Sequence, residues 1–214
     1  MPGEMLLGPL LNYLDNLVPE RPDEMKKMEA YASEHRFPII GPACGFLCYQ
    51  VARMVNAKNV YELGSGFGYS TAWFAKAVTE NGGGKVHHVV WDQKLSDMAK
   101  THLANLGYDD TINYTVGEAT EALRNTDEQF DVIFCDIDKE GYPAAIPVVK
   151  EKLRKGGVLL VDNMLWQGKI FDDANQEKNT VAIRETTKLL TEDPTWNSSL
   201  IPIRDGLMVS FKNN

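Results

Sequence analysis

The segment that decides the fold is residues 59–79, which read NVYELGSGFGYSTAWFAKAVT. The first five residues are mostly apolar and predict a short buried strand, and the residues from Ser70 onward predict a helix. Between them lie Gly64, Gly66 and Gly68, which allow the backbone to turn sharply. A strand that leads through a glycine loop into a helix is typical of an open α/β sheet, where ligands bind outside the carboxyl ends of the strands.

The rest of the chain repeats this alternation. Further strands are expected at 85–91, 112–116, 130–135 and 157–161, and helices at 6–17, 22–35, 42–55 and 95–106. Short, almost wholly apolar strands favour a parallel sheet that is covered on both faces. Near the C-terminus, residues 200–203 and 207–211 flank Asp205-Gly206, a typical hairpin turn. We expect an α/β fold with a doubly wound, mostly parallel seven-stranded sheet, an antiparallel C-terminal hairpin and extra N-terminal helices.

Length and composition narrow the class of protein. The chain has 214 residues, 43% of them hydrophobic, and a formal net charge of -8. We expect one domain, 1–214, with N-terminal helices in 1–56 and the catalytic sheet in 57–214. The acidic balance opposes bulk attraction to nucleic acid or an anionic membrane, and no apolar run reaches the ~18 residues of a membrane helix. Three cysteines without CxxC spacing, and an N-terminus without a basic leader, favour a cytoplasmic location.

The ligand of the glycine loop can be narrowed further. Tyr69 occupies the position of the last glycine in a dinucleotide fingerprint, and the loop has no P-loop lysine. Glu62 disfavours a diphosphate and suits a positively charged ligand. Asp92 after the second strand could accept both ribose hydroxyls, and residues 118–119 after the third strand could meet an adenine ring. Together they predict S-adenosylmethionine; the alternative is a plain turn with solvated strand-end acids.

A second candidate site follows the fourth and fifth strands. Asp136, Asp162 and Asn163 offer two carboxylates and one amide oxygen at the same sheet edge. Such ligands suit Mg²⁺ or another hard divalent cation such as Ca²⁺ or Mn²⁺, and no His or Cys indicates zinc. Near a cation the pKa of Lys139 is expected to fall, which would make it a general base. The alternative is a pair of strand-end acids and a surface lysine that pairs with a neighbouring carboxylate.

Three segments carry a resemblance to a known family. They are ELGSGFGYS at 62–70, FCDIDKEGY at 134–142 and GGVLLVDNMLWQG at 156–168, and residues 201–207 resemble the family's closing hairpin. The chain resembles the cation-dependent O-methyltransferases, the group of catechol and caffeoyl-CoA O-methyltransferases. The resemblance implies a Rossmann-like methyltransferase fold and a homodimer. It also implies methyl transfer from S-adenosylmethionine to a catechol-like small phenolic acceptor that chelates Mg²⁺.

The same resemblance assigns roles to residues. It implies metal ligands at Asp136, Asp162 and Asn163, and a catalytic pair of Lys139 as base and Asp136 beside it. Trp166 resembles a substrate-side aromatic. The implied cofactor contacts are Ile40, Gly41, Glu62, Gly64, Ser65, Ser70, Asp92, Glu118, Ala119 and Asp136. The run GPACG at 41–45 departs from the family's polar run, and residues 170–179 match no particular substrate loop.

Other interpretations of the sequence remain open. The nearest is methylation of a hydroxylated nucleoside in tRNA through a basic groove, which a steep salt dependence of RNA binding would support. The groove residues would be Arg21, Lys26, Lys27 and Arg53. A non-catalytic nucleoside-binding module and an NAD-binding dehydrogenase are further alternatives. The leucine face of the first helix fits either plain core or a dimer contact; its members are Leu6, Leu10, Leu14 and Leu17.

Overall fold

A computed structural model describes residues 7–213, so Leu6, the expected first residue of the first helix, lies outside the described part. A seven-stranded sheet has the order β3-β2-β1-β4-β5-β7-β6. Its strands are β1 (Asn59–Leu63), β2 (Lys85–Val90), β3 (Ile112–Val116), β4 (Phe130–Cys135), β5 (Leu153–Val161), β6 (Trp196–Ile201) and β7 (Leu207–Lys212). Strands β1 to β5 pair in parallel, and β7 pairs antiparallel with β5 and β6. The predicted doubly wound sheet with an antiparallel C-terminal hairpin is confirmed.

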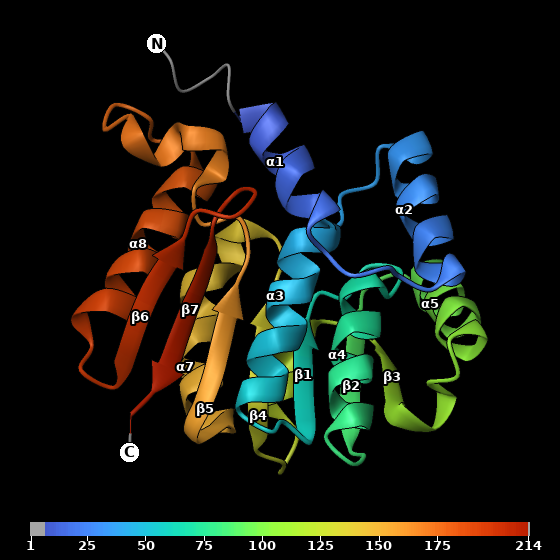
Figure 1. Cartoon of the computed structure of the whole chain (residues 1–214). Coiled ribbons are helices and arrows are strands. Elements are labelled where there is room, and N and C mark those ends of the chain that lie inside the picture. Colours follow the sequence, from blue (N-terminus) through green and yellow to red (C-terminus); the bar gives the residue numbers. More distant parts are fainter. Residues whose placement is uncertain (1–6, 214) are drawn as a thin grey trace.

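The helices cover both faces of the sheet (Figure 1). They are α1 (Leu7–Asn16), α2 (Asp23–His35), α3 (Gly41–Met54), α4 (Tyr69–Glu80), α5 (Gln93–Asn105), α6 (Ala119–Arg124), α7 (Tyr142–Lys152) and α8 (Lys178–Glu192). Short 3-10 turns are η1 (Asp109–Thr111), η2 (Lys139–Gly141) and η3 (Trp166–Phe171). Helices α1 and α2 lie above the carboxyl ends of the parallel strands, so they roof the edge where ligands bind. None of the helices described combines the length and apolar character that crossing a bilayer requires.

Alternate residues of each central strand enter two hydrophobic cores. In β4, Val132 and Phe134 pack with helices α2 to α5, while Ile133 and Cys135 pack with α6 to α8. This alternation is the pleat of a strand that is buried on both faces. In β1 the same alternation directs Glu62 toward α4, although burying a carboxylate there has a high desolvation cost.

Several elements differ from the sequence-based expectations. Helices α6, α7 and α8 were not predicted; α7 carries Pro143 in its first turn and Pro147 inside, which mask its helical pattern. Strand β5 begins four residues before the expected Gly157, across a register irregularity against β4. Leu10 on α1 and Leu17 just after it are 46% and 61% exposed, so the interpretation of this face as plain core is wrong for both.

Candidate functional site

A cavity of about 1190 Å³ opens at the carboxyl ends of the parallel strands. Its walls come from the glycine loop, the ends of β2, β4 and β5, and the segments around α1 and α3. The sequence-predicted site residues that line it are Ile40, Gly64, Ser65, Ser70, Ala119, Asp136, Lys139, Asn163 and Trp166. Both candidate sites therefore open into one space.

The glycine loop is held between β2 and β4. The backbone N–H of Asp136 donates to Leu63 O at 2.8 Å, and Ser65 exchanges two hydrogen bonds with the backbone of Val89. Gly64 has φ of 85°, and a Cβ built there would lie 2.5 Å from Asp136 O. Glycine is required at this position both by the left-handed backbone and by this close approach.

Glu62 lies beneath the loop and not in the cavity wall. Its side chain is fully buried, and its carboxylate accepts hydrogen bonds from Ser70 Oγ and Thr71 Oγ1, each at 2.5 Å. Burial raises the pKa of Glu62 to about 7, although the two hydroxyls pull it in the opposite direction. In this arrangement the carboxylate fastens the loop to the first turn of α4, a support role that sequence reasoning missed.

The buried carboxylate predicts a pH-dependent stability. Because the pKa of Glu62 rises from 4.5 to about 7 on folding, the folded chain binds this proton more tightly than the unfolded chain. The free energy of unfolding therefore falls by about 3 kcal/mol as pH rises through that window. We expect Glu62→Gln to remove this component, so that urea denaturation of the variant changes less between pH 5 and pH 7.5. The exposed Glu185→Gln is the control, and parallel pH profiles for Glu62→Gln and wild type would contradict the assignment.

The structure does not place Asp92 and Glu118 in the cavity wall. Asp92 Oδ1 accepts from Leu95 N at 3.0 Å, and the Glu118 carboxylate accepts from the backbone of the first turn of α6. Asp92 is the N-cap of α5 and Glu118 is the N-cap of α6. An acidic side chain after a strand can thus cap the next helix as well as bind a ribose. Where a ribose acid was expected, the wall consists of Val90 and Trp91, and Trp91 is 65% exposed. Gly41 and Asp162 also lie outside the lining.

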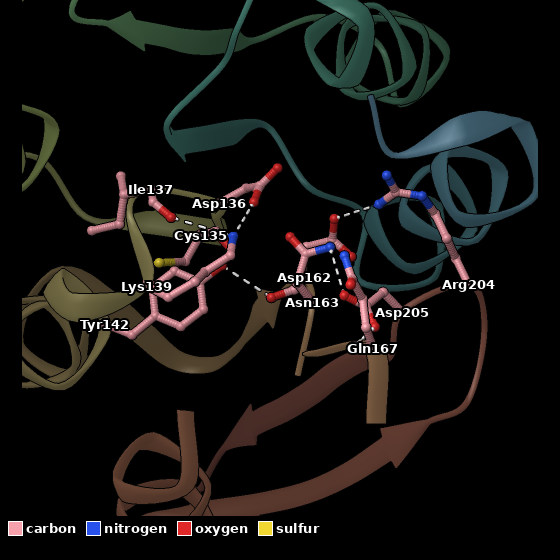
Figure 2. Close-up of polar contacts among 10 residues, drawn as sticks. All are labelled: Cys135, Asp136, Ile137, Lys139, Tyr142, Asp162, Asn163, Gln167, Arg204 and Asp205. Atoms are coloured by element: carbon pink, nitrogen blue, oxygen red, sulfur yellow. Dashed lines mark hydrogen bonds and ion pairs between the residues drawn. The ribbon is translucent and has the colours of Figure 1, made fainter. Parts of the chain in front are cut away.

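The acidic motif after β4 holds Lys139 in a fixed place (Figure 2). Lys139 Nζ donates to Asp136 Oδ1 and to Tyr142 Oη, each at 2.7 Å, and to Ile137 O at 3.3 Å. Tyr142 Oη donates in turn to Asp162 O at 3.0 Å, so it joins the ends of β4 and β5. Tyr142 was missed as a site residue, although it lies three positions after Lys139, one helical turn away.

Asp162 is almost completely buried at the end of β5. Its Oδ2 accepts from Arg204 Nη1 at 3.0 Å, while Oδ1 has no hydrogen-bond partner among residues 7–213. Burial raises the pKa of Asp162 to about 6; the charge of Asp136 adds to the rise and Arg204 opposes it. A buried carboxylate oxygen without a partner is costly and indicates a ligand that the protein alone does not supply.

These donors fit a hard divalent cation. Asp136, Asp162 and Asn163 converge as two carboxylates and an amide, and Oδ1 of Asp162 is free to bind. Within the described part of the chain, no three His, Cys, Asp or Glu side chains gather where they could hold an ion. Asp136, Asp162 and Asn163 supply only three ligands, so an octahedral ion would keep its other coordination positions for water or an acceptor, as Mg²⁺ commonly does.

The loop after β5 is fastened to the turn between β6 and β7. Asp205 accepts hydrogen bonds from the backbone N–H groups of Leu165 and Gln167, at 2.8 and 2.6 Å, and Met164 N donates to Gly206 O. These contacts hold Trp166 in the cavity wall, where its Nε1 lacks a partner among the residues described. Arg204 and Asp205 also line the cavity. The sequence indicated only a hairpin turn here.

Known proteins resemble this chain over nearly its whole length. Residues 20–213 match the family described as O-methyltransferase. A Dictyostelium discoideum protein named "Probable caffeoyl-CoA O-methyltransferase 2" is 28% identical over 96% of this chain and 92% of its own. The catechol O-methyltransferase of Niastella koreensis is 26% identical over 89% of this chain and 88% of its own. The Bacillus cereus O-methyltransferase structure in complex with SAH superposes with a TM-score of 0.86 at 22% identity, covering 96% and 97% of the two chains. The chain belongs to the O-methyltransferase family.

Proposed function

We propose that this protein transfers the methyl group of S-adenosylmethionine to a hydroxyl of a catechol-like phenolic small molecule, and that it needs Mg²⁺ or a similar divalent cation. The observation that carries the proposal is the meeting of the glycine loop with Asp136, Lys139 and Asn163 in one cavity. Names of relatives add support, since they include catechol and caffeoyl-CoA O-methyltransferases. The Bacillus cereus enzyme was solved in complex with SAH, the product that remains after methyl transfer.

The methyl donor would bind along the glycine loop. Gly64 and Ser65 present backbone there, and Ser70 lies at the N-terminal end of α4, where unpaired N–H groups and the helix dipole favour a carboxylate. Ile40 lines the same wall, and Ala119 lies at the start of α6. The carboxylate of Asp136 lies beside the loop and suits the positive sulfonium or amino group of this donor.

Asp136, Asp162 and Asn163 would hold the cation. When bound, it supplies a positive charge that lowers the pKa of the acceptor's hydroxyls and draws two vicinal oxygens into one place. Lys139 lies next to this set, so it can take the proton of the hydroxyl that reacts. Its three hydrogen bonds hold Nζ in place beside Asp136.

The transfer itself requires no covalent enzyme intermediate. The acceptor oxygen forms a bond to the methyl carbon while the carbon–sulfur bond breaks, and its electron pair stays on sulfur. The hydroxyl proton passes to Lys139, so charge and atoms balance. Most of the rate then comes from holding two reactants in line and from the fixed charges of the site.

The tRNA alternative loses support from the structure. Each basic residue of the suggested groove is paired with a carboxylate: Arg21 with Glu29, Lys26 with Glu20, Lys27 with Glu24 and Arg53 with Glu80. A patch that is neutralised by its own acids offers little attraction to phosphates. The homodimer stays a proposal; the exposed Leu10 and Tyr13 of α1, with Leu17 just after the helix, offer an apolar face for such a contact.

Methyl transfer to a catechol, followed with labelled S-adenosylmethionine, tests the proposal. We expect a chelator to abolish turnover and added Mg²⁺ to restore it. Asp162→Asn should lower kcat/KM by at least about 100-fold, because it removes charge from the cation site with little change in shape. Asp173→Asn, in an exposed loop, is the matched control. If neither the chelator nor Asp162→Asn lowers turnover, the metal mechanism is refuted and the family assignment stays intact.

A further inference from the structure

We propose that Arg204 is an internal cation that competes with the divalent cation for Asp162, so that the guanidinium must leave this carboxylate before the cation binds it fully. The inference rests on the proposed function. Arg204 Nη1 already lies 3.0 Å from Asp162 Oδ2, one of the oxygens that the cation would need. Its side chain is 30% exposed, whereas that of Asp162 is 1% exposed, so the arginine borders solvent and the aspartate does not.

The backbone at Arg204 is built to aim this side chain inward. Arg204 has φ of 51° in the turn between β6 and β7, a left-handed conformation that costs a non-glycine residue ~1–2 kcal/mol. The turn is locked next to the loop after β5, since Asp205 and Gly206 accept hydrogen bonds from Leu165 and Met164. A strained position that persists in a fastened turn is typical of a functional constraint.

Two carboxylates of the site are paired with cations of the chain without any metal. Asp136 pairs with Lys139 and Asp162 pairs with Arg204, and the two cations approach from opposite sides (Figure 2). A divalent cation among these groups would face two positive side chains at short range, where repulsion is poorly screened. Removing Arg204 from Asp162 relieves this repulsion and frees Oδ2 as a ligand. The metal-free and metal-bound sites therefore differ by the place of one guanidinium.

A second hollow next to the main cavity could accept the displaced side chain of Arg204. It measures about 460 Å³, and Arg204 lines both it and the main cavity. Asp15 and Glu29 line this hollow, so two carboxylates face the space beyond the main site. Glu29 already pairs with Arg21 through both carboxylate oxygens and accepts from Tyr69 Oη, whereas Asp15 accepts from Ala43 N through Oδ1 at 3.0 Å, so Asp15 offers the larger remaining acceptor capacity. A released guanidinium could be stabilised there.

Mn²⁺ binding by the full-length protein, measured by the EPR signal of free Mn²⁺, tests this competition apart from catalysis. We expect Arg204→Gln to bind Mn²⁺ about tenfold more tightly than wild type, because a polar side chain is kept and the competing charge is lost. Arg204→Lys keeps the charge and should bind less tightly than Arg204→Gln. Arg124→Gln removes a surface arginine that pairs with Glu121, and it should match wild type.

The outcomes separate the inference from the proposed function. Asp162→Asn reports whether the ion occupies this site: if it weakens Mn²⁺ binding while Arg204→Gln equals wild type, the competition is refuted and the metal site stands. Loss of binding in Arg204→Gln would also refute the competition, since the arginine would then assist the ion. If neither wild type nor Arg204→Gln binds Mn²⁺, or if Asp162→Asn binds normally, the metal site and the competition both fail.

Discussion

Replacing Lys139 with methionine is expected to lower kcat for methyl transfer by about 10³-fold, in the range that loss of a general base produces. The side chain is 10% exposed and its Nζ contacts Asp136, Tyr142 and the Ile137 carbonyl. Methionine preserves the length of the stem but cannot take a proton. The acceptor would still bind, so the KM for a catechol should change by much less than kcat.

Lys178→Met is the matched control. Lys178 is exposed, and its Nζ lies 3.9 Å from Glu140 Oε2. The substitution therefore removes a lysine near the same loop, at a position that does not line the cavity. Thermal unfolding of both variants shows whether the fold survives. A Lys139→Met protein that folds and retains kcat within about threefold of wild type would exclude the base role.

The second large effect is expected at Gly64. In Gly64→Ala the new Cβ would meet the backbone carbonyl of Asp136 at 2.5 Å, at a position with φ of 85°. Neither the strand end nor the loop can yield without disturbing the other, so we expect a loss of about 3 kcal/mol in the free energy of unfolding. Binding of S-adenosylmethionine should weaken by at least about tenfold, as measured by calorimetry.

Gly83→Ala isolates the contact from the backbone conformation. Gly83 has φ of 93°, similar to Gly64, but a Cβ there meets nothing within 4 Å. We expect this variant to lose about 1 kcal/mol and to bind the methyl donor normally. If both alanine variants lose equal stability, the close approach of Gly64 to β4 contributes nothing.

The alternation of apolar strands with helices predicted the sheet and its C-terminal hairpin well. The pattern could not reveal α7, because Pro143 and Pro147 interrupt its helical signal and tertiary packing overrides their cost. For the site, chain order placed Asp136, Lys139 and Asn163 near the glycine loop, since parallel strands end at one edge. This topological rule requires no side-chain detail.

Other roles depended on three-dimensional contacts that a local pattern does not contain. An aspartate after a strand can bind a ligand or cap the next helix, and Asp92 caps α5. Glu62 faces α4 because of the pleat of β1, so it supports the loop from below. The pairing of Arg204 with Asp162 joins residues 42 positions apart, a contact that only the strand order β5-β7-β6 creates.

The contact between Gly64 and Asp136 has a consequence for how such a protein could change its acceptor. Because the loop and the strand end touch through backbone alone, their spacing depends on no side chain that substitution could change, apart from the glycine itself. The opposite wall, with Trp166, Gln167 and Asn179, is made of side chains on a loop and a helix end. New acceptors could therefore evolve by exchanges on that outer wall, while the reacting geometry is inherited unchanged.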